Sequence, residues 1–211
     1  MNTLTTEKII GIVDVMSDVI IRNEIPFCEL DSAAGDGDFG MSVAKGFKVL
    51  KAEWKELDTE DIGAFLKSCG MIITEHCGGA SGPIWGSAFR SAGKFAAGKT
   101  EVNLAEFAEL MQAAVDGIQK RGGAKLGDKT LLDALIPTTE SLKDSAAKGL
   151  DFKTAFDLGA KAACEGAEKT REYAASKGRA SYVGDRSLSY PDAGAMALGI
   201  IFTEIAEKLT A

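Results

Sequence analysis

The chain has 211 residues, 45% of them hydrophobic, which suits one domain with a sizeable core. The formal net charge of −7 argues against nucleic acid and anionic membranes as general partners, because both require a basic face. The sequence has no run of about 18 apolar residues and no basic, apolar leader, so we expect a cytoplasmic protein. The four cysteines form no CxxC pair and are expected to be buried, reduced thiols.

Apolar residues recur at spacings of three and four along most of the chain, which predicts an all-α fold of eight helices. The first is expected to be capped by Thr5 or Thr6, to reach about Asn23 and to be stopped by Pro26. The others are expected over residues 40–54, 61 to the glycines at 78–79, around 83–97, 103–119, 130–147, 151–176 and 192–208. Short connections predict an antiparallel up-and-down bundle or barrel, with residues 1–211 forming one nucleotide-binding domain.

Three aspartates, Asp31, Asp36 and Asp38, lie within eight residues of one another in the glycine-rich segment LDSAAGDGDFG. Carboxylates this close repel one another unless a cation lies between them, and Mg²⁺ and Ca²⁺ take oxygen ligands of this kind. A helix is expected to follow at once, so its free amides would face a phosphate group held by the metal. The alternative is an acidic surface turn. An EF-hand is excluded because neither Asp31 nor Asp36 has a glutamate at the twelfth position of its loop.

Four connections concentrate glycine with polar residues, whereas the others resemble ordinary helix caps. They read DSAAGDGDFG, CGGASGP, RGGAKLGDKT and KGRASYVGDRSLSYPDAG. These connections follow the first, third, fifth and seventh expected helices, and alternate loops of an antiparallel bundle lie at the same end. The sequence therefore predicts a composite site at one end of the bundle, suited to Mg²⁺ and a nucleotide polyphosphate.

Several polar residues of these loops also have ordinary interpretations. The glycine pair of GGASG is typical of a helix C-cap. Arg179 and Arg186 are compatible with solvated surface charges, and Lys129 and Thr130 with the start of a helix. The sequence GDKT lacks the complete pattern of a P-loop. His76, the only histidine, is interpreted as a partner of a helix C-terminal dipole or as a packing residue.

The series LDSAAGDGDFG, GGASGP, GDKTLLDALIP and GRASYVGDRS followed by PDAGA resembles the nucleotide-binding L subunit, or L domain, of the dihydroxyacetone kinase family. The resemblance extends from the first helix to the last, with the motifs in the same order. It implies an eight-helix antiparallel barrel with ADP or ATP and two Mg²⁺ ions at one end, the metal pair being held by Asp31, Asp36 and Asp38. It also implies the residues that surround the nucleotide: Phe39, Gly40, Met41, Ser42, Ala80, Ser81, Gly122, Leu131, Arg179, Asp192, Ala193 and Gly194.

The resemblance further implies that this chain is the phosphoryl-transferring subunit of a ketose kinase. In the family a partner K subunit holds the keto sugar covalently, so the chain alone is expected to phosphorylate nothing and to need no catalytic base. Arg179 is the candidate stabiliser of transition-state charge. Some members exchange ATP, and others retain ADP that a phosphotransferase-system protein rephosphorylates; a free-standing chain favours the second type. Association as a homodimer stays open.

Two positions depart from the family pattern. Phe39 replaces the histidine of DGDHG, and Ala193 replaces the proline of DPGA. Neither change removes an aspartate, so metal binding is expected to persist, while Phe39 bears on how the phosphates are held and which ketose is used. Erythrulose is one alternative substrate. A nucleotide-sensing regulator and a metal-dependent phosphohydrolase remain alternative functions.

Overall fold

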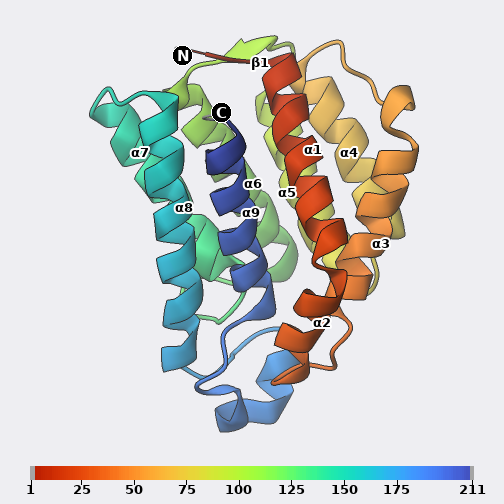
Figure 1. Ribbon diagram of the computed structural model, residues 1–211, viewed down its shortest axis with the longest axis vertical. Helices are drawn as coiled ribbons and strands as arrows, with labels where there is room; N and C mark the ends of the chain where they lie inside the picture. Colours follow the sequence, from red (N-terminus) through yellow and green to blue (C-terminus); the bar gives the residue numbers. More distant parts are fainter. Residues whose placement is uncertain (1–2, 210–211) are drawn as a thin grey trace.

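The structure is a computed structural model that describes residues 3–209, and α-helices make up most of it (Figure 1). The helices are α1 (Thr6–Arg22), α2 (Glu24–Ser32), α3 (Phe39–Ala52), α4 (Ile62–His76), α5 (Ser81–Phe95), α6 (Leu104–Gly122), α7 (Leu132–Ala147), α8 (Phe152–Lys169) and α9 (Ala193–Leu209). Three 3-10 helices are η1 (Trp54–Glu56), η2 (Thr170–Glu172) and η3 (Arg179–Ser187). The predicted all-α class is confirmed.

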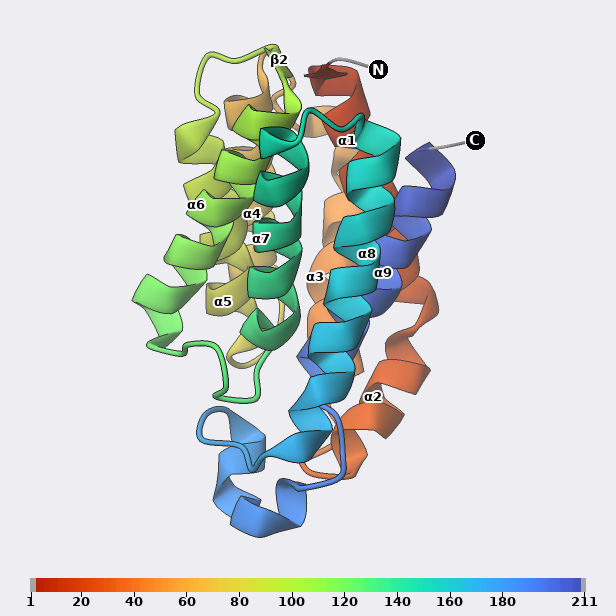
Figure 2. The same cartoon turned by 90° about the vertical axis from the view of Figure 1, so that its left-hand side faces the viewer.

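Eight long helices form a closed ring, in which each packs against the next along the chain and α9 packs back against α1. The ring runs α1, α3, α4, α5, α6, α7, α8, α9, and its members lie side by side along the long axis of the molecule (Figures 1 and 2). The short helix α2 packs against α3 outside this order. The predicted up-and-down barrel is therefore confirmed. No helix within residues 3–209 combines the length and apolar character needed to cross a membrane.

The apolar stripes of the ring helices meet in one core. Aromatic rings contact one another in it, as in the pairs Phe47 with Trp85, at 6.1 Å between ring centroids, and Phe107 with Phe156, at 5.3 Å. An apolar cavity of about 130 Å³ lies among side chains of α1, α5, α6 and α9. Burial of these stripes is the main favourable contribution to folding, since the hydrophobic effect scales with the apolar area removed from water.

Three local predictions were wrong. Pro26 does not stop the first helix; it lies in the first turn of α2, where the missing amide of proline is tolerated, so the chain continues as a further helix. The seventh expected helix ends at Lys169 and not near Ser176, because the chain turns at Thr170 into η2. Cys164 is exposed, although Cys69 and Cys77 are buried as expected.

A short antiparallel pair of strands was also not predicted. Strand β1 (Leu4–Thr5) pairs with β2 (Glu101–Val102) beside the start of α1. Strands of two residues carry no periodic signal in a sequence. The pair joins the first residues of the described chain to the connection between α5 and α6, at the end of the barrel opposite the four glycine-rich connections (Figure 2).

The contact between α7 and α8 requires glycine. A Cβ added to Gly166 would lie 2.2 Å from the backbone oxygen of Asp133, so we expect Gly166→Ala to lower the free energy of unfolding by about 1–3 kcal/mol. A Cβ added to Gly11 in α1 would have no heavy atom within 4 Å, so Gly11→Ala should raise the free energy of unfolding by about 0.5–1 kcal/mol. Urea denaturation of both variants measures the difference. Equal effects would contradict the close α7–α8 contact.

Candidate functional site

The four glycine-rich connections lie at the same end of the barrel, which confirms the expectation drawn from alternate loops. They join α2 to α3, α4 to α5, α6 to α7 and α8 to α9, at the lower end of both views (Figures 1 and 2). Backbone hydrogen bonds link neighbouring segments at this end. The Gly78 amide donates to the backbone oxygen of Ser42, in the first turn of α3, at 2.9 Å, and the Ser176 amide donates to the backbone oxygen of Asp128 at 3.2 Å. Segments far apart in the sequence therefore form one surface.

The three aspartates converge at this end. One carboxylate oxygen from each of Asp31, Asp36 and Asp38 lies within 4.8 Å of the others. Asp31 is half-buried in the last turn of α2, and the other two are exposed in the turn before α3. The turn is held by the Asp31 carboxylate, whose Oδ2 accepts the amides of Gly37 at 2.9 Å and Asp38 at 3.2 Å. The local fold thus holds like charges together, as a site for a hard divalent cation requires.

Burial raises the pKa of Asp31, against the lowering effect of the amides that it accepts from the turn. The neighbouring charge of Asp36 raises it further. A bound cation would remove this unfavourable charge, because an opposite charge at such distances favours the ionised form of a carboxyl group. The donor set, three carboxylates with no sulfur or imidazole, fits Mg²⁺ in chemistry.

Arg179 lies beside this aspartate cluster. Its Nε is 3.0 Å from Oδ2 of Asp36, although the two residues come from opposite parts of the chain. Both side chains are well exposed, so the ion pair contributes little to stability. The contact places the guanidinium group beside the aspartate cluster, and the planar donors of this group are suited to a phosphate.

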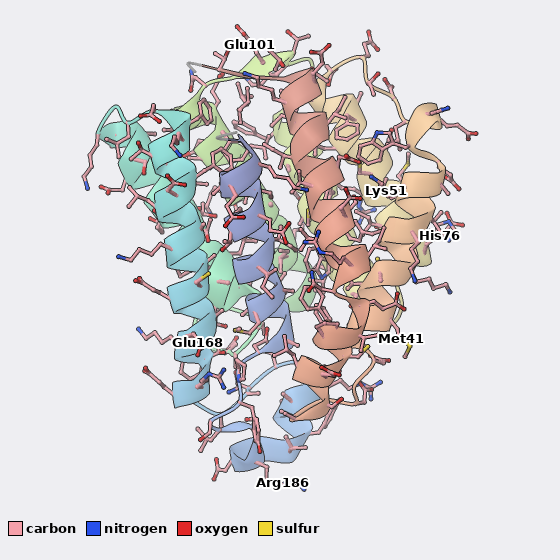
Figure 3. All side chains as sticks on the ribbon, viewed as in Figure 1. Met41, Lys51, His76, Glu101, Glu168 and Arg186 are labelled. Carbon is pink, nitrogen blue, oxygen red and sulfur yellow. The ribbon has the colours of Figure 1, made fainter. Side chains whose placement is uncertain are left out.

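The first turn of α3 contains four of the residues implied by the resemblance. Ser42 lies against Gly78, whose added Cβ would be 2.7 Å from the serine Oγ. Gly40 is buried against α2, where an added Cβ would lie 1.9 Å from the Glu24 oxygen. Met41 is 55% exposed and lies at the outer side of this turn (Figure 3). The start of α3 and the turn before α5 are thus neighbours. The Met41 amide already donates to the Cys28 sulfur at 3.3 Å, so the amides at the start of α3 are in part engaged within the protein.

Phe39 does not project into the site as a polar residue would. Its ring contacts Phe27 of α2, with 6.1 Å between the ring centroids, and packs against the core. Its backbone amide still points toward Oδ2 of Asp31, at 3.4 Å. The substitution noted in the sequence has therefore replaced a polar side chain by a packing contact between α2 and α3.

The remaining implied residues lie at the start of α5, the end of α6 and the start of α9. Ala80 and Ser81 begin α5, and Gly122 ends α6, close enough to α5 that an added Cβ would meet Ile84 at 2.9 Å. Gly194 packs against Leu131, whose Cβ would lie 3.2 Å from an added Cβ. These positions share the functional end of the barrel with the aspartate cluster.

Asp192 caps α9. Its Oδ2 accepts the Ala195 amide at 2.8 Å, and Ala193 and Gly194 form the first turn of the helix. Burial raises the pKa of Asp192 to about 7, and the nearby carboxylates of Asp133 and Asp31 raise it as well. The interaction with Asp31 indicates that the start of α9 lies near the aspartate cluster.

Sequence reasoning missed the buried polar residues of the α6–α7 connection. Asp133 is 1% exposed and accepts the Tyr173 hydroxyl at 2.7 Å, together with the amides of Gly127 and Thr130. Lys129, interpreted from the sequence as the start of a helix, is likewise 1% exposed. The available signal was the spacing of charged residues in GDKTLLD, directly before an apolar helix. Arg186, by contrast, is exposed at the tip of the α8–α9 connection (Figure 3), as a surface charge would be.

Comparison with known proteins identifies the family. The DAK2 domain family matches residues 33–207. The chain belongs to this family. It is 39% identical over 184 residues to the PEP-dependent dihydroxyacetone kinase 2, ADP-binding subunit DhaL, of Listeria innocua, covering 85% of this chain and 84% of that protein. It is 32% identical over 196 residues, 93% of each chain, to the PEP-dependent dihydroxyacetone kinase, ADP-binding subunit DhaL, of Escherichia coli. It is therefore a DhaL-type member of the family.

Longer relatives contain a similar region. The L-erythrulose 1-kinase of Mycolicibacterium smegmatis is 31% identical over 207 residues, which cover 96% of this chain and 36% of that protein. The crystal structure of the dihydroxyacetone kinase from C. freundii in complex with AMP-PNP and Mg²⁺ has a TM-score of 0.71 and 27% identity, covering 95% of this chain and 33% of that one. The DhaL-type chain thus corresponds to one part of these larger kinases.

The raised pKa of Asp192 predicts how stability depends on pH. A carboxyl group whose folded-state pKa lies above the unfolded value binds its proton more tightly in the folded state. The protonated Asp192 side chain therefore contributes to stability at low pH, and this contribution is lost as the pH rises through about 7. Asp192→Asn keeps a capping oxygen and removes the charge, and should raise the free energy of unfolding at pH 8 by about 1 kcal/mol. At pH 4 the effect should vanish. Urea denaturation at both values measures it, with exposed Asp157→Asn as control; an equal gain at pH 4 would contradict the titration of Asp192.

Proposed function

We propose that this chain is the nucleotide-binding, phosphoryl-transferring subunit of a dihydroxyacetone kinase, acting on a ketose held by a partner K subunit. The observation that carries this function is the convergence of three carboxylates within 4.8 Å, with the Arg179 guanidinium 3.0 Å from one of them. Phosphoryl transfer requires chiefly positioning and the neutralisation of charge, and these residues supply both.

The residues of the chain divide this work between them. Asp31, Asp36 and Asp38 would hold two Mg²⁺ ions, which supply charge neutralisation to the phosphates when bound. The start of α5, with Ala80 and Ser81, orients the phosphates, and Arg179 stabilises the charge that develops on the transferred group. We assign no catalytic base to this chain, because Phe39 stands at the position where the family pattern DGDHG has a histidine. The proton acceptor and the ketose belong to the partner.

We further propose that ADP stays bound as a coenzyme and that a phosphotransferase-system protein rephosphorylates it. Two relatives that match this chain over most of both lengths are named as ADP-binding subunits of PEP-dependent kinases. The erythrulose kinases are longer proteins of which this chain covers about a third. Their presence among the relatives makes erythrulose the second candidate substrate.

The metal assignment is tested by Asp36→Asn. We expect the variant to fold and to lose Mg²⁺-dependent ADP binding by a factor of about 100 or more, because the uncharged amide is a poor ligand for a hard cation. Calorimetry with ADP, with and without Mg²⁺, measures the affinity. Asp157→Asn is the matched control, since it changes the net charge equally on the exposed face of α8. Unchanged ADP affinity in Asp36→Asn would exclude the proposed metal site.

The reaction is tested by mixing the purified chain with ATP, Mg²⁺, dihydroxyacetone or erythrulose, and a K subunit. We expect ketose phosphate to form only in the presence of that subunit, because the substrate is held there. Mass spectrometry detects the product. Phosphate release without the K subunit would instead indicate a hydrolase, and tight binding without any turnover would indicate a sensor.

A further inference from the structure

Lys129 has an unusual environment for a lysine. Its side chain is buried, with 1% exposed. Its backbone has a φ of 61°, a left-handed conformation that residues other than glycine rarely adopt. Its ammonium group donates to the backbone oxygens of Thr170 and Tyr173, the second at 3.0 Å. Burial lowers the pKa of Lys129, whereas the charges of Asp192 and Asp133 favour the charged form of this ammonium group.

The two carbonyl groups lie where α8 ends. The last carbonyls of a helix have no partner within it, and a cation beside them is favoured by the helix dipole. Lys129 thus contacts the chain where it leaves α8 and enters residues 170–192, here termed the 170–192 loop. Two further contacts attach this loop to the α6–α7 connection: the Tyr173 hydroxyl with Asp133, at 2.7 Å, and the Ser176 hydroxyl with Asp128, also at 2.7 Å.

The two ends of the 170–192 loop are also joined to each other. The Asp192 amide donates to the Thr170 hydroxyl at 2.9 Å, and the Ser189 amide donates to the Arg171 oxygen at 3.0 Å. Thr170, whose carbonyl accepts from Lys129, is thus bonded directly to Asp192, the cap of α9. Arg179 lies three residues beyond Ser176 on the same loop, and reaches Asp36 of the aspartate cluster.

We propose that Lys129 is a positioning residue for phosphate binding, whose buried ammonium group fixes the 170–192 loop so that Arg179 lies beside the aspartate cluster. Lys129 acts through Arg179 and has no contact with the nucleotide of its own. Stability alone does not require a buried charge here, since apolar replacements of buried ionic groups are often neutral or stabilising. This inference rests on the proposed function, because phosphate binding is the property that Arg179 serves.

The test is a double-mutant cycle of Lys129→Met with Arg179→Ala, read by calorimetry of Mg²⁺ and ADP. Methionine keeps the length of the side chain and removes its charge. We expect Lys129→Met to weaken ADP binding by about fivefold or more, and Arg179→Ala to have less than about a twofold further effect in that background. In the wild-type background Arg179→Ala alone should cost about tenfold. Independent, multiplicative effects would overturn the proposal, because a merely stabilising lysine would leave the contribution of Arg179 intact.

Controls separate positioning from loss of fold. Lys125→Met, on the same connection but with an exposed side chain, should bind ADP like the wild type. Lys129→Arg keeps donors for the two carbonyl groups and should restore most of the affinity. Should Lys129→Met fail to fold, Tyr173→Phe removes another attachment of the loop and should show the same loss of the Arg179 effect; additive behaviour of this variant would equally overturn the proposal.

A second readout needs no ligand. Trypsin should cleave the 170–192 loop of Lys129→Met at least about threefold faster than that of the wild type at equal global stability, since the loop has lost its attachment to the barrel. Equal cleavage rates would contradict the inference about Lys129. Failure of the wild-type chain to bind Mg²⁺ and ADP would instead contradict the proposed function, so the two ideas fail by different observations.

Discussion

The structure at the functional end depends on holding three like charges close together. Coulomb repulsion alone would drive Asp31, Asp36 and Asp38 apart, and the fold opposes it by anchoring Asp31 at the end of α2 and by bonding its carboxylate to the amides of the following turn. The apolar core of the barrel, against which Leu30 and Phe39 pack on either side of this turn, offsets the cost of this arrangement. Three carboxylates held in this way favour a nearby positive charge, and the Arg179 guanidinium, 3.0 Å from Asp36, supplies one in the structure.

The antiparallel ring explains how one site is assembled from four segments. Each return of the chain brings another glycine-rich connection to the same end, and the connections then bond to one another as well as to their own helices. The backbone is strained only where this assembly requires it. The non-glycine residues with positive φ in the described chain are Lys129 and Ser189, and both belong to the contacts that hold the 170–192 loop. Strain that gathers in this way is typical of functional sites.

The sequence was sufficient for the ring and for the shared end, because helical periodicity and alternation of loops are local or topological properties. It was insufficient where a distant contact decides the local structure. The sequence predicted a helix that continues to Ser176, whereas the helix ends at Lys169, and Lys129, more than forty residues earlier, bonds to carbonyl groups just beyond that point. Asp31 was predicted with the other aspartates, but its location in a helix was missed for a different reason: Pro26 was interpreted as a stop, although a proline in the first turn permits a new helix.

The phenylalanine at position 39 shows which part of the site the side chains determine. A polar residue there would offer the phosphates one hydrogen bond, whereas the contact of Phe39 with Asp31 is made by its backbone amide and not by its side chain. The ring of Phe39 instead packs on Phe27 and strengthens the junction of α2 with α3, the two helices that hold the aspartates. Exchange of a polar contact for a packing contact therefore leaves the three carboxylates of the proposed metal site in place, because backbone amides hold the turn that carries them.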